Sequence, residues 1–177
     1  VQPSGPYQLL GWSLGGVLAF EMARQLVQAG QQVSLLALLD SYAPGSPLPE
    51  LQGAPEQMLL RWFLSDLTRQ KGDSGDQELP LDGLTELGPA LSRLRAKGLL
   101  PPDAQEAQLE ALYALFRRNL QLTVGYRPGD YAGPVLLLRA AAAGVAAAPD
   151  HGWRALCSGQ LEVVELPGDH YTIVGPA

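Results

Sequence analysis

One stretch decides the fold of this chain: Tyr7-Gln8-Leu9-Leu10-Gly11-Trp12-Ser13-Leu14-Gly15-Gly16. It opens with a short apolar run that predicts a strand, ended by Gly11. After Ser13, apolar residues recur at positions 14, 17, 18, 22, 26 and 29, which is helical spacing, and Gly30 is a typical residue to end the helix. A G-x-S-x-G pentad lies between the two elements. The stretch therefore predicts a strand, a sharp turn that carries a serine, and a helix.

Further apolar runs predict the rest of a sheet. Residues 33–39 are almost continuously apolar, as expected for a parallel strand covered on both faces. With the opening stretch they complete a strand–helix–strand unit. Residues 134–139 and 161–166 give later strand signals, and the alanine-rich residues 140–148 between them are interpreted as a loop. Together these runs predict an α/β fold with a mostly parallel sheet flanked by helices.

The middle of the chain is rich in helix signals instead. Residues 54–70 predict an amphipathic helix, residues 84–97 a weaker helix interrupted by Gly88-Pro89, and residues 103–124 a long helix with Asp103 as its N-cap. A polar, glycine-rich connection over residues 71–80 separates the first two. We interpret most apolar side chains of these helices as packing residues: Leu59, Phe63, Leu67, Leu91 and Leu94. We expect one domain over residues 1–177, with a helical lid inserted at about residues 48–100.

The composition excludes several classes of protein. Apolar residues make up 46% and charged residues 17%, which fits a globular fold. The formal net charge of −6 gives no electrostatic case for binding nucleic acid, and the apolar runs are too short to span a bilayer. Two histidines and one cysteine do not predict a structural zinc site. Cys157, interpreted as a small core residue, cannot form a disulfide within the chain, so we expect a reducing compartment, the cytoplasm.

The serine of the pentad is the candidate nucleophile. Glycines at the flanking positions let the chain turn sharply without collision, and this leaves the Ser13 hydroxyl exposed at the edge of the sheet. The following helix aims its positive end at the same place. The backbone N–H of Leu14 can donate to an oxyanion, a contribution of about 3 kcal/mol per donor. The alternative is an ordinary glycine-rich turn between a strand and a helix.

A serine hydroxyl needs a base, and the chain offers two histidines. His170 follows the strand signal 161–166 through a short loop, which places it at the sheet edge that carries Ser13. His151 lies between Pro149-Asp150 and a helix predicted from Trp153, and we interpret it as a solvated turn residue. We therefore predict His170 as the base, with the alternative that it is a surface loop residue.

Asp40 is the predicted acid that orients the base. It ends the strand at residues 33–39, and a carboxylate directly after apolar residues is unfavourable to bury without a partner such as an imidazole N–H. Asp150 and Asp130 compete for the role, but Asp130 precedes its strand and is expected at the opposite edge. The remaining alternative for Asp40 is an aspartate that caps backbone N–H groups at the start of a loop. The order Ser, Asp, His along the chain is that of α/β-hydrolases.

Five segments, in order along the chain, resemble one family, the type I thioesterase domains that terminate nonribosomal peptide synthetases. Residues 5–16 resemble its nucleophile turn, and Leu38-Leu39-Asp40 resembles its acid. Residues 63–67 resemble its first lid helix, and residues 126–135 resemble the run into its next strand. Pro167-Gly168-Asp169-His170-Tyr171 resembles its histidine motif. The resemblance covers nearly the whole chain.

The resemblance implies an α/β-hydrolase fold and a release enzyme. Ser13 would take an acyl or peptidyl chain from the 4′-phosphopantetheine arm of a carrier domain in the same synthetase, with no cofactor bound directly. His170 would act as base and Asp40 would fix its tautomer. Water would then hydrolyse the acyl-enzyme, or a nucleophile within the acyl chain would close a macrocycle. Members of the family have further strands and a second oxyanion donor upstream and a closing helix downstream, so we expect these outside the chain.

Two other functions remain open from the sequence. One is a free-standing serine esterase or lipase-like hydrolase, which would turn over soluble esters without a carrier. The other is a hydrolase-fold binding module without catalysis, in which the lid would serve as a docking surface. Trp12, within the pentad, is interpreted as a packing residue at the turn under each of these hypotheses.

Overall fold

The computed structural model describes residues 2–45, 56–69, 79, 81, 83–101, 103–142 and 148–175. These residues form two compact units. One unit combines Val1–Pro49 with Thr123–Ala177, and the other is Glu50–Leu122. The first holds the sheet and the second holds helices, so the chain leaves the sheet after its second strand and returns before its third.

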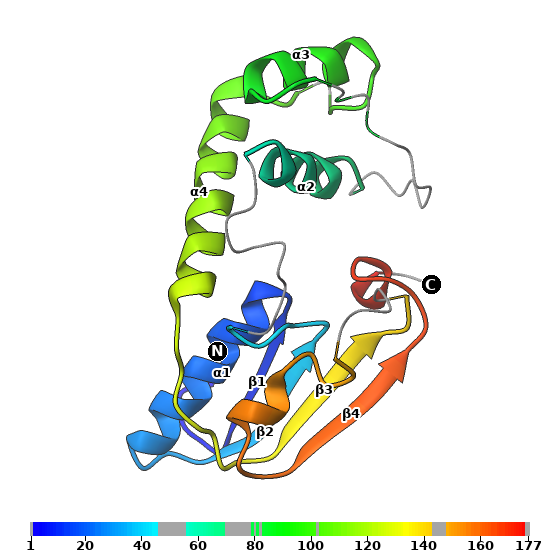
Figure 1. Cartoon of the computed structure of the whole chain (residues 1–177). Coiled ribbons are helices and arrows are strands. Elements are labelled where there is room, and N and C mark those ends of the chain that lie inside the picture. The colour runs from blue at the N-terminus through cyan, green and yellow to red at the C-terminus, as the bar shows by residue number, and fades with distance from the viewer. Residues whose placement is uncertain are drawn as a thin grey trace. The chain divides into compact units, whose positions relative to one another are not determined.

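The sheet unit is built on parallel strands (Figure 1). Its described strands are β1 (Tyr7–Trp12), β2 (Val33–Leu39), β3 (Val135–Ala140) and β4 (Leu161–Leu166), and they lie side by side in that order. All three neighbouring pairs are parallel. The carboxyl ends of the four strands therefore meet at one edge of the sheet, where the loops that follow them gather. The predicted parallel sheet is confirmed.

The central strand explains why its sequence is apolar throughout. β2 lies between β1 and β3, and Leu36, Ala37 and Leu38 are all buried. Helix α1 (Leu14–Gln28) contributes Val17, Phe20 and other apolar residues to the same core, as its helical spacing predicts. Rings from later segments pack on Phe20: Tyr131 at 5.8 Å and Trp153 at 4.9 Å between ring centroids. Cys157 is buried in this core, as predicted.

Helix α1 ends where the sequence indicates. Gly30 adopts φ 74°, a left-handed conformation that glycine reaches without strain. Its N–H donates to the carbonyl of Val27, and the N–H of Gln31 donates to the carbonyl of Leu26. This pair of bonds is the Schellman arrangement, which satisfies carbonyls at the end of a helix and turns the chain toward β2.

The helical unit has a core of its own. Helices α2 (Glu56–Arg69), α3 (Leu87–Ala96) and α4 (Glu106–Gly125) supply its helical elements, and α4 runs past the end of the unit into the sheet unit. The buried residues come from all three helices and the segments between them: Leu60, Phe63, Leu64, Leu81, Ala90, Leu91, Leu94, Leu100, Leu109 and Tyr113. Packing is therefore what these apolar faces do within the unit, as the sequence predicts for most of them.

Two helix boundaries differ from the prediction. Asp103 lies in a turn, and α4 begins only at Glu106, so its assignment as N-cap is wrong. The second helix begins at Leu87, which puts Pro89 in the first turn. Proline is tolerated there because first-turn N–H groups have no acceptor within the helix.

Most of the predicted connection at residues 71–80 and much of the predicted loop at 140–148 lie outside the described residues. Among the described helices, none combines the length and apolar character needed to cross a membrane.

Candidate active site

Ser13 occupies the sharp turn between β1 and α1. Its backbone has φ 55° and ψ −126°, a conformation that non-glycine residues rarely adopt and that carries strain of about 1–3 kcal/mol. The turn is held by two backbone hydrogen bonds. The Ser13 N–H donates to the carbonyl of Leu39 at 2.9 Å, and the Ser13 carbonyl accepts from the N–H of Gly16 at 3.0 Å. The backbone thus fixes Ser13 at the carboxyl end of β1, directly beside the end of β2.

Two glycines, Gly11 and Gly16, make this turn possible. The pentad suggests Gly11 and Gly15, so the second of its glycines is not the one required. A Cβ on Gly11 would lie 2.0 Å from the carbonyl oxygen of Gly15, and one on Gly16 would lie 2.4 Å from the side chain of Ser41. A Cβ on Gly15 would meet nothing within 4 Å outside its own helix. The predicted collision is confirmed at Gly11 and is wrong at Gly15. The second close approach is at Gly16, where α1 crosses the chain that follows β2.

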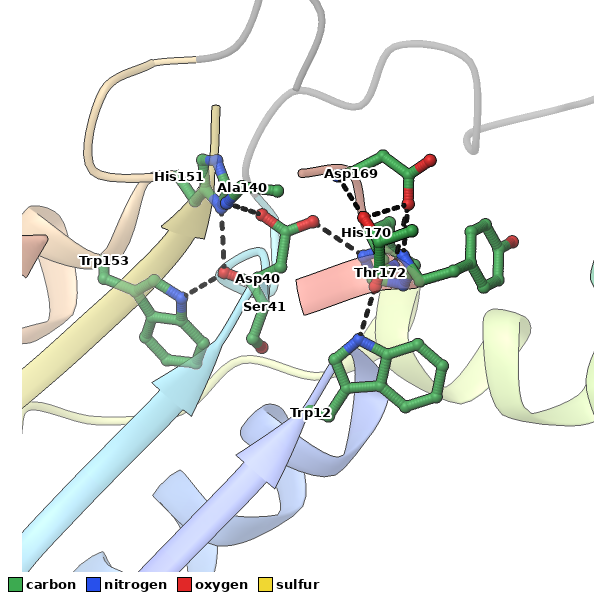
Figure 2. Close-up of polar contacts among 10 residues, drawn as sticks. Trp12, Asp40, Ser41, Ala140, His151, Trp153, Asp169, His170 and Thr172 are labelled. Atoms are coloured by element: carbon green, nitrogen blue, oxygen red, sulfur yellow. Dashed lines mark hydrogen bonds and ion pairs between the residues drawn. The ribbon is translucent and has the colours of Figure 1, made fainter. Parts of the chain in front are cut away.

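Asp40 begins the loop after β2 and is almost fully buried, with 2% of its surface exposed. Its backbone adopts φ 41°, and its N–H donates to the carbonyl of Leu138 in β3 at 2.7 Å. One carboxylate oxygen, Oδ1, accepts from the N–H of Ala140 at 2.9 Å. The other, Oδ2, lies 2.7 Å from Nδ1 of His170 (Figure 2). Both oxygens therefore have partners, which is what a buried carboxylate requires.

The charge of Asp40 follows from these contacts. Burial alone raises the pKa of the carboxyl group, but hydrogen bonds from His170 and from the N–H of Ala140 lower it. The balance leaves the pKa of Asp40 below its ordinary value. Asp40 is therefore ionised at neutral pH, and its Oδ2 accepts a hydrogen bond from the Nδ1–H of His170. This hydrogen bond selects the tautomer in which Nε2 of the neutral ring carries the lone pair.

The loop after β4 holds His170 in place. Oδ1 of Asp169 accepts from the N–H groups of Tyr171 and Thr172, both at 2.9 Å, and the Asp169 N–H donates to the Thr172 hydroxyl at 2.8 Å. A further bond comes from another strand, because the indole N–H of Trp12 donates to the carbonyl of His170 at 2.9 Å (Figure 2). The His170 side chain keeps 31% of its surface exposed. The base candidate is thus partly open to solvent on a well-braced loop.

His151 has a different environment from the one predicted. The prediction of a solvated turn residue is wrong, because His151 is fully buried. Its ring stacks on Tyr42 with centroids 4.0 Å apart, and Nδ1 lies 3.3 Å from the carbonyl of Ser41. The same carbonyl accepts the indole N–H of Trp153 at 2.7 Å. Burial lowers the pKa of His151, so the ring is neutral at physiological pH.

The other two candidate acids are occupied elsewhere. Asp150 accepts from the N–H groups of Gly152 and Arg154, at 3.1 and 3.2 Å, and so caps the short helix η1 (Trp153–Leu156). Asp130 lies before β3, at the amino ends of the strands, as the sequence predicts. Of the three aspartates, Asp40 is the one whose side chain hydrogen-bonds His170.

Leu14 is the first residue of α1, where an N–H has no acceptor within the helix. Its role at an oxyanion stays a prediction. Trp12 is 37% exposed and packs on the rings of His170 and Tyr171, but sequence reasoning missed its hydrogen bond to His170 and the contribution of Thr172. The spacing Asp169-x-x-Thr172 is a local turn pattern that could have predicted the hydrogen bonds between these two residues. Trp12 carried no such signal. Among the described residues, no group of three or more His, Cys, Asp or Glu side chains is arranged to hold a metal ion.

Comparison with known proteins points to one family. The sequence profile described as "Thioesterase domain" matches residues 1–177. A dimodular nonribosomal peptide synthase of Bacillus subtilis (strain 168) is 31% identical over 99% of this chain, which spans 7% of that protein. A four-domain nonribosomal peptide synthetase structure, holo-AB3403 bound to AMP and glycine, is 34% identical with a TM-score of 0.80, over 98% of this chain and 13% of the other. The NocB thioesterase domain, in covalent complex with a fluorophosphonate nocardicin G analogue, is 29% identical with a TM-score of 0.63, over 97% of this chain and 60% of that one.

Proposed function

The chain belongs to the thioesterase domain family, and from that premise we propose that it releases acyl or peptidyl chains from a carrier domain through an ester of Ser13. The observation that carries the proposal is the 2.7 Å contact between Asp40 and Nδ1 of His170, at the sheet edge where Ser13 follows β1. A buried, ionised carboxylate that holds an imidazole tautomer is the arrangement a serine hydrolase needs.

In the first half of the proposed reaction, the Ser13 hydroxyl attacks the carbonyl of a thioester. Nε2 of His170 takes the hydroxyl proton, and the carbonyl electrons move onto the oxygen, which the Leu14 N–H stabilises as an oxyanion. As the carbon–sulfur bond breaks, His170 gives its proton to the departing thiolate. The products are an ester on Ser13 and a free thiol on the carrier. Asp40 stabilises the imidazolium that forms between the two proton transfers.

In the second half, a nucleophile attacks the Ser13 ester, and His170 again takes a proton and returns it to the Ser13 oxygen. Water gives a free acid, and an amine or hydroxyl within the acyl chain gives a macrocycle. The carrier would present its substrate on a 4′-phosphopantetheine arm. The relatives support a carrier-bound substrate. Three curated proteins matched over nearly the whole chain are named as synthases or synthetases, and two of these names specify nonribosomal peptide synthesis.

The lid is also part of this proposal. The chain between β2 and β3 forms a compact helical unit with its own buried core, which supports a role separate from the sheet. We propose that the stretch at about residues 48–100, most of which belongs to this unit, acts as the lid of the domain. Its buried leucines hold the unit together, so residues at its surface rather than its core would contact substrate.

The proposal is tested with a matched pair of substrates, a peptidyl pantetheine thioester and the oxygen ester of the same peptide. Intact-protein mass spectrometry follows the acyl-enzyme, and product analysis separates acid from macrocycle. We expect an adduct on wild-type protein with the thioester, its loss in Ser13→Ala, and slower reaction of the oxygen ester. Faster turnover of simple oxygen esters would favour a free-standing esterase instead.

A fluorophosphonate probe tests the non-catalytic alternative. Such probes react with activated serines, so labelling that disappears in Ser13→Ala supports an enzyme. Folded wild-type protein that stays unlabelled would support a binding module. Circular dichroism on both proteins is the control, because Ser13→Ala must keep the fold for the comparison to count.

A further inference from the structure

We infer that Trp12 is a positioning residue, whose indole N–H fixes the backbone of His170 and so sets the direction in which Nε2 points. The inference rests on the proposed function for its kinetic consequence but not for its geometry. It concerns the second residue of the pentad, Gly11-Trp12-Ser13, whose side chain would otherwise be only a partly exposed ring at the end of β1.

The contact joins segments that are far apart in the chain. Trp12 Nε1 donates to the carbonyl of His170 at 2.9 Å across 158 residues, and the two rings lie 5.1 Å apart between centroids, tilted by 31°. The rings of Trp12 and Tyr171 also form an edge-to-face pair, with centroids 6.2 Å apart and planes at 72°. Because Trp12 and Ser13 are adjacent, the indole attaches the His170 loop to the segment that carries the nucleophile.

This hydrogen bond complements the one that Asp40 accepts from His170. Trp12 and Leu39 are register partners in β1 and β2, and Asp40 follows Leu39 directly. His170 is therefore held through its main chain by the residue before Ser13 and through its ring by the residue after Leu39. The Asp40 bond alone leaves the imidazole free to swing about Nδ1. With the carbonyl also fixed, the swing is restricted and the opposite nitrogen keeps one direction.

The hydrogen bonds within the loop act on the loop itself. The Asp169 carboxylate accepts from the N–H groups of Tyr171 and Thr172, and these bonds stabilise the shape of the loop. Gly168 has φ 108°, and its carbonyl accepts from the N–H of Ala142, which ties the loop to the chain after β3. None of these bonds sets the distance between His170 and β1. Catalysis by a base needs its nitrogen within hydrogen-bond reach of the hydroxyl, and a misplacement near 1 Å lowers rate by about 100-fold.

The test compares Trp12→Phe, which keeps an aromatic ring but has no N–H, with Trp12→Leu, which has neither. We expect Trp12→Phe to lower kcat on a pantetheine thioester by about 10- to 100-fold with KM unchanged, and Trp12→Leu to fall little further. Thermal unfolding should move little, because the side chain is partly exposed. A role of the ring alone predicts instead that Trp12→Phe keeps wild-type kcat while Trp12→Leu loses it, and that result would overturn the inference.

A second readout does not depend on activity. A histidine Nδ1 proton held by a carboxylate gives a low-field proton resonance in the NMR spectrum. Its assignment to His170 is checked by its loss in Asp40→Asn. We expect the resonance to broaden by exchange with water in Trp12→Phe, because the ring moves more. An unchanged resonance would overturn the inference even if the wild-type protein hydrolyses no thioester, whereas an inactive wild type with a broadened variant resonance would remove the proposed function alone.

Discussion

The loops after β3 and β4 each bring a histidine toward Asp40, in opposite environments (Figure 2). We call residues 148–153 the His151 loop and residues 167–172 the His170 loop. His151 is fully buried, stacked on a ring and bonded to a backbone carbonyl, whereas His170 is 31% exposed in its side chain and bonded to a carboxylate. The two residues have the same side-chain chemistry, so their surroundings alone distinguish the proposed base from the buried histidine.

The difference shows how burial and partner together decide the role of an imidazole. Burial lowers the pKa of His151, and it outweighs the charge of Asp40 and the hydrogen bond to the Ser41 carbonyl, which both favour the protonated ring. His170 has a carboxylate on Nδ1 and an open side, which is the combination a base requires. The comparison therefore predicts opposite responses of activity and stability to changes at the two positions.

The largest expected effect comes from replacing each of the two histidines in turn by a residue that cannot act as a base. We expect His170→Gln to lower kcat by about 10⁴- to 10⁶-fold with little change in unfolding free energy. His151→Asn keeps an N–H donor near the place of Nδ1 and tolerates φ 49°, so we expect less than a tenfold change in kcat. It should lower the free energy of unfolding by about 1–3 kcal/mol through lost packing. Thioester turnover and urea unfolding measure both; equal losses of kcat in the two variants would break the comparison.

The next effect concerns Asp40, the carboxylate that accepts the hydrogen bond of His170. Asp40→Asn is expected to keep the fold and lower kcat by about 10⁴-fold, because an amide in its place favours the wrong tautomer of His170. Near-normal turnover would remove Asp40 from the mechanism.

The same variant tests stability against pH. The folded pKa of Asp40 lies below its ordinary value of 3.8, so the wild type holds its added stability above that pH and loses it as the pH falls through the folded pKa. Unfolding free energies between pH 5 and the acid transition should therefore decline more steeply in wild type than in Asp40→Asn. Parallel curves for the two proteins would contradict the lowered pKa.

A pair of glycine variants tests the close packing of α1 against the chain that follows β2. Gly16→Ala places a Cβ 2.4 Å from the side chain of Ser41, so we expect a loss of about 3 kcal/mol or more in unfolding free energy. Gly15→Ala meets nothing within 4 Å and should stabilise α1 by up to about 1 kcal/mol. Removing the opposing side chain with Ser41→Gly should recover much of the Gly16→Ala loss. Equal effects of the two alanines would mean that α1 does not cross the chain at Ser41.

The smallest effect is the pH dependence that His151 gives the folded protein. Because burial places its folded pKa below the ordinary value of 6.5, the unfolded chain binds the extra proton, and stability is lost as the pH falls below about 6.5. The slope is at most about 1.4 kcal/mol per pH unit for one group. His151→Asn removes this group while Asp40, Arg139 and Asp150 around it are kept. Urea unfolding at pH 7.5, 6.5 and 5.5 should give a flatter curve for the variant; identical slopes would mean that His151 is already accessible to protons.

Sequence alone predicted the contact between Asp40 and His170 better than the environment of His151. Periodicity predicted the parallel sheet, and chain order with strand ends led to Asp40 and His170, since local patterns encode strands and their edges. The burial of His151 could not be predicted, because it depends on Tyr42 and on a Ser41 carbonyl 110 residues away. The Trp12 contact is equally non-local. The late start of α4 shows the limit of capping rules, as Asp103 fits an N-cap but lies in a turn.

The most direct measurement is a crystal structure of the protein after reaction with a fluorophosphonate. We predict phosphorus bonded to Oγ of Ser13, Nε2 of His170 within about 3 Å of an adduct or serine oxygen, Asp40 still on Nδ1, and His151 buried as before. Phosphorus on another residue, or a His170 ring turned away from Ser13 while Asp40 remains bound to it, would contradict the assignment of the two histidines.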